Sequence, residues 1–212
     1  MTGFPRPSFL IISLISLLAA AGLTSCGSNS IGGYGKDHRN KMIVSVRDQK
    51  MLLVRDGTPV KSYKISTSKF GVGDRPGTNC TPLGRLQVAK KIGDNAPLGS
   101  VFKARRRTGE VIAPNSPGRD PVVTRILWLS GTESRNQNAF RRTIYIHGTP
   151  EERRLGSPAS YGCIRMGSRD VADLYNRVGA GADVFVIRGS IQTKKEGEST
   201  ASNGKTGMKS RG

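Results

Sequence analysis

Alternating apolar and polar residues predict a series of short β-strands through the middle of the chain. The alternation begins at Lys41, after which Met42, Val44 and Val46 occupy every second position. A period of two is typical of a strand that buries one face. The same alternation, or a content of β-branched and aromatic residues, predicts further strands at 51–55, 60–66, 85–90, 100–104, 122–129, 143–146 and 183–187.

One segment has the period of a helix. Ser168 is its predicted N-cap and Gly179 its predicted end. The apolar residues between them follow the i, i+3, i+4, i+7 pattern, at Val171, Leu174, Tyr175 and Val178. This stripe is expected to pack on the sheet. Many short strands and one helix predict a mainly β domain over residues 41–189.

The two ends of the chain are expected to lie outside this domain. Residues 1–25 combine a weakly positive start, an apolar stretch at 9–18 and mostly small residues, which predicts a secretory signal peptide. A transmembrane helix is the alternative, but the apolar stretch is shorter than the ~20 residues that span a bilayer. Residues 26–40 are predicted to be a flexible tether, and residues 190–212 a disordered basic tail.

The charge of the chain is strongly positive. Thirty-four Lys and Arg residues stand against 15 Asp and Glu residues, which gives a formal net charge of +19. Such a balance favours anionic partners, nucleic acid among them. The basic residues are scattered or form short clusters, without a recognition helix, zinc-ligand spacing or aromatic stacking motif. We therefore expect no nucleic-acid partner, and a basic surface suited to an anionic cell envelope.

Three cysteines are too few for a disulfide framework in a domain of this size, so each needs its own explanation. The segment Leu23-Thr24-Ser25-Cys26 resembles the bacterial lipobox, which implies lipid modification of Cys26 and cleavage before it. The alternative is an ordinary secretory signal with an incidental cysteine. A lipid anchor implies a protein of the cell envelope that faces the periplasm or extracytoplasmic space. Gly27 after the cysteine favours the outer membrane if the source has one.

Cys163 and His147 are the candidate catalytic pair. The strand at 143–146 should end at His147-Gly148, and Gly162 frees the backbone before Cys163. A thiol attacks as thiolate, and a nearby imidazole, Arg165 or the following helix N-terminus would raise the thiolate fraction. Backbone N–H groups around Gly162 could hold an oxyanion. The alternative is a buried cysteine and a hydrogen-bonded histidine, but an unpaired cysteine between Gly and Arg in an exported protein favours catalysis.

These residues belong to a longer pattern. The segments 147–149, 155–156 and 160–166 read His-Gly-Thr, Leu-Gly and Ser-Tyr-Gly-Cys-Ile-Arg-Met. They resemble the signature of the YkuD-type (ErfK/YbiS/YcfS/YnhG-like) L,D-transpeptidases, which runs from His-Gly to Ser-x-Gly-Cys-x-Arg. Upstream, Thr81-Pro82-Leu83-Gly84 resembles the Thr-Pro-x-Gly segment of the family. The resemblance covers residues 41–188.

The resemblance implies a β-sandwich-like domain, with one helix after the nucleophile loop, that acts on peptidoglycan stem peptides. Cys163 would be the nucleophile, His147 the general acid/base, and the backbone carbonyl of Gly148 the group that orients the imidazole. The enzyme would cleave before the D-Ala at position four and transfer the acyl group to an amine, either of another stem, giving a cross-link between third residues, or of an envelope protein. No cofactor or metal is implied, and a monomer is expected.

Several questions stay open at this level. Tyr161 departs from the family pattern, in which many members have His or Ser at this position, and its side chain is a candidate for contact with substrate. Arg165 can bind substrate or brace the loop, and Ser160 is equally ambiguous. Cys80 is expected to be a free thiol, with a reversible disulfide to Cys163 as the sharper hypothesis. The alternatives for function are an L,D-carboxypeptidase or amidase on the same scaffold, and a non-catalytic peptidoglycan-binding lipoprotein.

Overall fold

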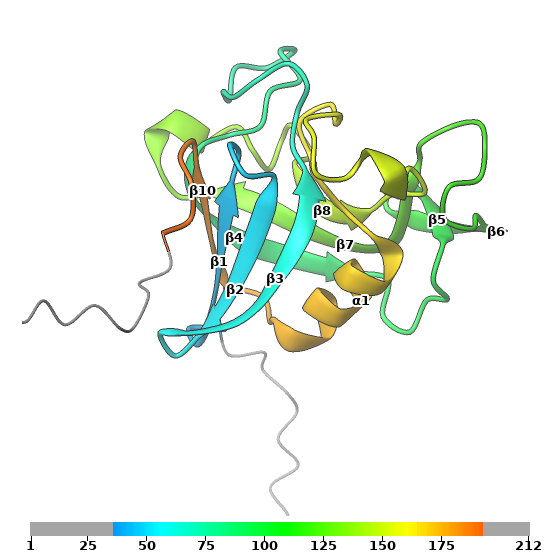
Figure 1. The fold of residues 1–212 in the computed structure, drawn as a ribbon, viewed down its shortest axis with the longest axis horizontal. Helices are drawn as coiled ribbons and strands as arrows, with labels where there is room; N and C mark the ends of the chain where they lie inside the picture. Colours follow the sequence, from blue (N-terminus) through cyan, green and yellow to red (C-terminus); the bar gives the residue numbers. More distant parts are fainter. Residues whose placement is uncertain (1–35, 193–212) are drawn as a thin grey trace, which may run out of the picture. The chain divides into compact units, whose positions relative to one another are not determined.

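The computed structural model describes residues 36–192, shown as the coloured ribbon in Figure 1. The predicted signal peptide, the lipid site at Cys26, residues 26–35 of the predicted tether and residues 193–212 of the predicted tail lie outside the described residues. From residue 36 to residue 192, no helix is long and apolar enough to cross a membrane.

Ten strands and one α-helix form the described domain. In chain order they are β1 (Asn40–Ser45), β2 (Lys50–Arg55), β3 (Thr58–Ser66), β4 (Gly84–Ile92), β5 (Ser100–Lys103), β6 (Arg106–Val111), β7 (Val122–Gly131), β8 (Tyr145–Gly148), β9 (Ile164–Met166), α1 (Ser168–Arg177) and β10 (Asp183–Ile187). Two short 3-10 turns, η1 (Ser134–Asn136) and η2 (Glu152–Arg154), precede β8 and β9. The predicted mainly β fold with a single helix after the nucleophile loop is confirmed.

The strands form one sheet that returns on itself. Their order is β4-β10-β1-β2-β3-β9-β8-β7-β5-β6, and β4 also pairs with β7. Because β4 has β10 on one side and β7 on the other, the two halves of the sheet face each other across a common core (Figure 1). The β1–β10 and β8–β9 pairs are parallel, and the other pairs are antiparallel.

The core explains why alternation predicted most strands. Met42 and Val44 of β1 and Leu86 and Val88 of β4 point inward and are almost fully buried. Helix α1 packs against β7 and β8, and its four predicted stripe residues all join this core. Burying apolar side chains of this kind contributes about 1.5–3 kcal/mol each. The helix is therefore held by its apolar face.

The ends of α1 differ from the prediction. Gly167 is the N-cap, and Ser168 is the first helical residue. The Ser168 hydroxyl accepts a hydrogen bond from Thr124 Oγ1 at 2.8 Å, and its N–H donates to Glu152 Oε1 at 2.8 Å. The predicted cap is thus wrong because tertiary partners engage Ser168. The last helical residue is Arg177, two positions before the predicted end.

Two strands were not predicted. All six residues of β6 are exposed, so no buried face marks the strand. All three residues of β9 are buried, so it also lacks alternation. In addition, β8 begins two residues later than predicted because Thr143 has φ +56, in the left-handed region.

The domain extends slightly beyond its predicted limits. Asp37, in the predicted tether, donates its N–H to Ala180 O at 2.8 Å and accepts the N–H of Gly179 at 2.6 Å. At the other end, Ser190 and Ile191 both donate hydrogen bonds to the Asp48 carboxylate. These contacts attach the flanking residues to the sheet.

Candidate active site

The parallel pair β8–β9 positions the predicted catalytic residues. Ile146 lies opposite Ile164, and both side chains are fully buried in the main core. His147 lies opposite Arg165, so these side chains point to the other face of the sheet. Cys163 immediately precedes β9 and by alternation shares that face. The sheet register thereby brings the histidine and the cysteine to one face of neighbouring strands.

Cys163 is a partly buried free thiol. Its Sγ atom accepts the N–H of Tyr145 at 3.4 Å and lies 3.5 Å from the carbonyl oxygen of Thr143. Burial raises the pKa of the thiol to about 11, although the Tyr145 N–H and the charges of Arg142 and Arg165 act in the opposite direction. The charge of Arg165 thus acts in the expected direction, towards the thiolate, but burial outweighs it. Cys163 rests as a thiol.

His147 is buried and hydrogen-bonded to the backbone. Its Nδ1 lies 2.7 Å from the carbonyl oxygen of Gly148, the atom that the family resemblance assigned to orient the ring. Burial lowers the pKa of His147, and the Gly148 carbonyl and Asp120 only partly offset this. The imidazole is therefore neutral near pH 7. With Nδ1–H donating to the carbonyl, Nε2 is left with a lone pair that can accept a proton.

The loop that leads into Cys163 is fixed by its own hydrogen bonds. Buried Ser160 donates its hydroxyl to the Cys163 carbonyl at 2.6 Å and accepts the Gly162 N–H at 3.2 Å. These bonds give Ser160 a role within the loop. They also engage the Gly162 N–H, which was predicted to hold an oxyanion.

The Thr-Pro-Leu-Gly segment at residues 81–84 contacts this loop through Thr81. Thr81 is fully buried, and its hydroxyl donates to the Gly162 carbonyl at 3.0 Å and accepts the Ser68 N–H at 3.0 Å. Gly162 itself has φ +117, and a Cβ there would lie 3.3 Å from both Cys80 O and Ile144 Cδ1. The left-handed backbone conformation therefore favours glycine before Cys163, and the space for a Cβ there is tight.

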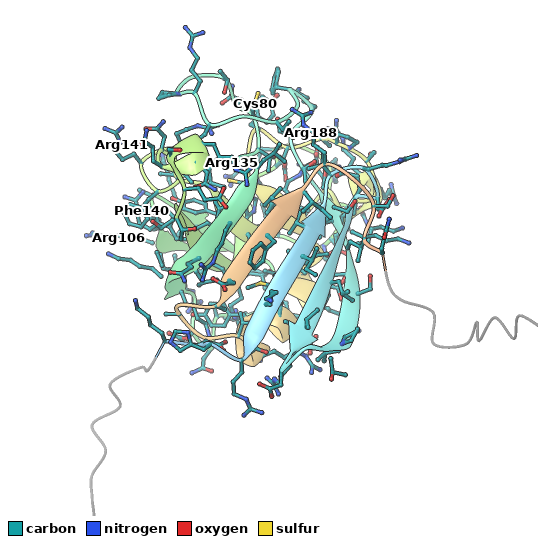
Figure 2. The ribbon with its side chains drawn as sticks, turned by 90° about the vertical axis from the view of Figure 1, so that its left-hand side faces the viewer. Cys80, Arg106, Arg135, Phe140, Arg141 and Arg188 are labelled. Atoms are coloured by element: carbon teal, nitrogen blue, oxygen red, sulfur yellow. The ribbon has the colours of Figure 1, made fainter. Side chains whose placement is uncertain are left out.

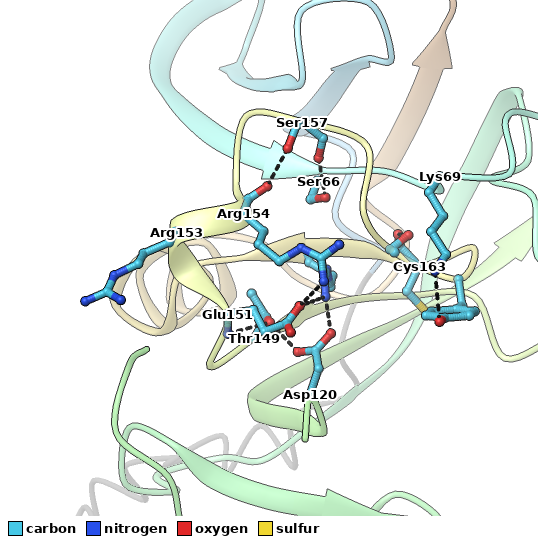
Figure 3. A network of polar contacts seen from close by, with 12 residues as sticks. Ser66, Lys69, Asp120, Thr149, Glu151, Arg153, Arg154, Ser157 and Cys163 are labelled. Atoms are coloured by element: carbon cyan, nitrogen blue, oxygen red, sulfur yellow. Dashed lines mark hydrogen bonds and ion pairs between the residues drawn. The ribbon is translucent and has the colours of Figure 1, made fainter. Parts of the chain in front are cut away.

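Arg165 is a buried side chain that pairs with two partly exposed carboxylates, those of Asp120 and Glu151, which Figure 3 labels. Its side chain is 3% exposed and forms ion pairs with Asp120 and, at 3.1 Å, with Glu151. Asp120 also accepts a hydrogen bond from the Thr149 hydroxyl. This placement favours the bracing role of Arg165 over direct contact with substrate. Asp120 was not predicted, because it lies in an irregular loop 45 residues from Arg165.

Cys163 opens into a surface pocket of about 400 Å³. Its lining residues are Pro76, Gly77, Asn79, Arg141, Arg142, Thr143, Ile144, Tyr161 and Cys163. Arg142 is fixed by a buried ion pair with Asp74 at 2.9 Å and by a 2.6 Å hydrogen bond to Cys80 O. Of this lining, sequence reasoning identified only Tyr161 and Cys163.

Cys80 is also a free thiol, and its Sγ donates to the Phe70 carbonyl at 3.1 Å. The hypothesis of a reversible disulfide with Cys163 stays a prediction. Within residues 36–192, no three His, Cys, Asp or Glu side chains converge to form a metal site.

Comparisons with known proteins identify one family. The family model of the YkuD L,D-transpeptidase catalytic domain matches residues 39–187. An L,D-transpeptidase structure from Mycobacterium tuberculosis has 19% identity and a TM-score of 0.46, over 71% of this chain and 58% of that one. One from Mycobacterium smegmatis has 14% identity and a TM-score of 0.45, over 70% and 58%. A mutant L,D-transpeptidase from Enterococcus faecium has 19% identity and a TM-score of 0.46, over 71% and 50%.

This chain thus spans less than two thirds of the length of these three solved structures. A comparison with curated proteins finds no match.

Proposed function

Because the chain belongs to the YkuD family of L,D-transpeptidase catalytic domains, we propose that it is a peptidoglycan L,D-transpeptidase with Cys163 as nucleophile. The observation that carries the proposal is the hydrogen bond of His147 Nδ1 to Gly148 O, on the strand next to Cys163. It orients the ring without a carboxylate and leaves Nε2 as the proton acceptor. A neutral base beside a neutral thiol is a competent starting state for acyl transfer.

In the first half-reaction, His147 Nε2 takes the proton from Cys163 as Sγ attacks the carbonyl carbon of the third stem residue. The Tyr145 N–H, 3.4 Å from Sγ, supports negative charge on sulfur while the proton leaves. Collapse of the tetrahedral adduct breaks the C–N bond to D-Ala, whose nitrogen receives the proton from His147. A thioester on Cys163 remains.

In the second half-reaction, an acceptor amine attacks the thioester carbonyl. His147 takes one proton from the amine, the C–S bond breaks, and the thiolate regains the proton. The products are a new amide and the free thiol, so every proton is accounted for. Water in place of the amine would give a tripeptide stem, which is the outcome of a carboxypeptidase.

The cellular setting is also part of the proposal. The lipobox resemblance supports an anchor at Cys26, with the domain facing the periplasm or extracytoplasmic space. Exposed basic side chains suit an anionic envelope; Arg106, Arg135, Arg141 and Arg188 extend from the side shown in Figure 2. A monomeric state and membership of the ErfK/YbiS-like subgroup stay predictions.

The test is incubation of the full-length protein with tetrapeptide muropeptides, followed by mass spectrometry. Release of D-Ala with cross-linked dimers supports transpeptidation, whereas tripeptides alone indicate a carboxypeptidase. Without an acceptor, a stem-peptide adduct should appear on the wild type and be absent from Cys163→Ala. Unchanged muropeptides that still bind the protein would contradict catalysis and favour the non-catalytic alternative.

A further inference from the structure

Three residues form a cluster on the rim of the Cys163 pocket, which we call the rim cluster: Lys69, Phe70 and Tyr161. The Lys69 ammonium donates a hydrogen bond to the Tyr161 hydroxyl at 3.0 Å and lies 4.4 Å from the centre of the Tyr161 ring. It is also 5.2 Å from the Phe70 ring centre. Figure 3 shows the Lys69 side chain, which follows β3 by three residues, extending into the same part of the site as Cys163.

The two aromatic rings of the rim cluster are unusually exposed. Phe70 is 49% and Tyr161 63% exposed, and their ring centres are 5.4 Å apart. Single exposed apolar residues are common on protein surfaces, but here two meet from distant segments, and one of them, Tyr161, lines the Cys163 pocket. An aromatic pair placed in this way offers a ready contact surface for a ligand that enters the pocket.

The charge of Lys69 is unpaired, unlike that of two nearby arginines. Arg142 is paired with Asp74, and Arg165 with Asp120 and Glu151. Arg141 resembles Lys69 in this respect, because its acceptor is the neutral Asn138 side-chain oxygen at 2.7 Å. Among residues 36–192, Lys69 forms no ion pair, and its hydrogen-bond acceptor is a phenol oxygen. The pocket rim therefore carries an uncompensated positive charge.

The two polar groups of the rim cluster are arranged to bind both oxygens of a carboxylate. Lys69 uses one of its three N–H donors on Tyr161, so two remain. The Tyr161 oxygen accepts that bond, so its own O–H is still available as a donor. Two such donors 3.0 Å apart can each bind one carboxylate oxygen, and hydrogen bonds to an ionised acceptor are the strong ones.

We propose that Lys69 and Tyr161 form a carboxylate-binding subsite at the pocket mouth, which holds a free carboxylate of the stem peptide. The Phe70 and Tyr161 rings would pack against the aliphatic part of the same stem. The inference rests on the proposed function for the identity of the ligand. In a stem whose diamino acid is lysine, which has no side-chain carboxylate, two carboxylates lie close to the cleaved bond: that of the acidic residue before the lysine, and the C-terminal carboxylate of D-Ala.

This subsite gives Tyr161 a specific role. The His or Ser that resembling sequences often carry at this position lacks a phenol that could receive Lys69 and retain a donor. The subsite would thus be a specificity device of this chain, separate from the thiol and imidazole that perform the chemistry.

The test measures binding to full-length Cys163→Ala protein by calorimetry, so that it does not depend on turnover. Three tetrapeptide stems are compared: one with free carboxylates, one amidated at the acidic residue, and one amidated at the C-terminus. Amidating the bound carboxylate should weaken binding by about 10-fold or more, as expected for loss of charge-assisted hydrogen bonds. The other amidation should have little effect, which identifies the source of the carboxylate.

Variants in the rim cluster complete the test. Lys69→Met should weaken binding of the free acid to the level of the amide and leave amide binding unchanged. Tyr161→Phe, which keeps the ring, should cause a smaller loss in the same direction. Lys103→Met is the matched control, because Lys103 is exposed at the end of β5 and outside the pocket lining. In protein that retains Cys163, Lys69→Met should raise KM more than it lowers kcat.

Two results would overturn the subsite. One is equal affinity for all three stems. The other is a Lys69→Met variant that loses as much affinity for the amidated stem as for the stem with free carboxylates. Discrimination by Cys163→Ala protein together with absent turnover in the wild type would instead overturn the proposed function and leave the subsite standing. Lys69, Tyr161 and Lys103 are exposed, and unchanged melting temperatures would show that their variants keep the fold.

Discussion

His147 Nδ1 and the carbonyl oxygen of Gly148 lie 2.7 Å apart, within one strand. The imidazole is thus oriented by the backbone of its own neighbour, so its geometry does not depend on the ionisation of a carboxylate partner. Because the ring is also buried, it rests uncharged, and so does Cys163. Both properties can be measured.

Stability should fall on mild acidification because of His147. Its folded pKa is lowered by burial, whereas the unfolded value is about 6.5. Between these two values the unfolded state binds more protons, so stability rises with pH and is lost as pH falls below about 6.5. Urea unfolding at about pH 7.5 and pH 5.5 should show this loss in the wild type and a smaller loss in His147→Gln. His38→Gln, at an exposed position, should behave as the wild type; equal losses in all three would contradict the prediction.

Alkylation of Cys163 should require alkaline pH. Since burial raises its thiol pKa to about 11, the iodoacetamide rate should keep increasing well above the free-thiol value of about 8.5. Peptide mapping by mass spectrometry measures Cys163 separately from the other cysteines. A small thiol such as glutathione serves as the control, with a rate that levels off nearer its own pKa. A rate for Cys163 that levels off below neutrality would show a resting thiolate.

Removing the charge of Asp120 should lower the stability of the fold and lower the pKa of His147. In Asp120→Asn, buried Arg165 loses a charged acceptor and retains Glu151, so we expect a loss of about 1–3 kcal/mol in urea unfolding. Because Asp120 raises the pKa of His147, the acid limb of the activity profile should also move to lower pH. Asp56→Asn, in an exposed pair with Arg39, should be indistinguishable from the wild type. An unchanged acid limb would leave Asp120 a purely structural role.

A side chain at position 162 should displace the nucleophile. Gly162→Ala places a Cβ at φ +117 and close to Cys80 O, at a cost of about 1–3 kcal/mol. Gly57→Ala is the control, because φ is +83 there and no atom lies within 4 Å of the added Cβ. Both variants should lose stability in urea, but only Gly162→Ala should change the alkylation rate of Cys163. Equal rates in both variants would show that the contact at Gly162 is relieved without moving the thiol.

The elements that were predicted correctly are those with a local pattern of apolar residues. Alternation predicted β1 and β4 because each buries one face, and the 3.6-residue period predicted α1 because its stripe packs on the sheet. By contrast, β6 exposes every residue and β9 buries every residue, so neither has an alternation to detect. Ser168 had the right residue type for a cap, but a hydrogen bond from Thr124 engages its hydroxyl.

The sequence by itself determined the mainly β class, the single helix, and the candidate pair His147 and Cys163, since these depend on residue type and spacing along the chain. The tertiary structure decided that Asp120 pairs with Arg165, that Lys69 meets Tyr161, and that Cys163 rests as a thiol. Each of these depends on the register of β8 and β9, on loops that return from distant positions, and on desolvation. No local pattern encodes them, because they arise only when separate segments pack together.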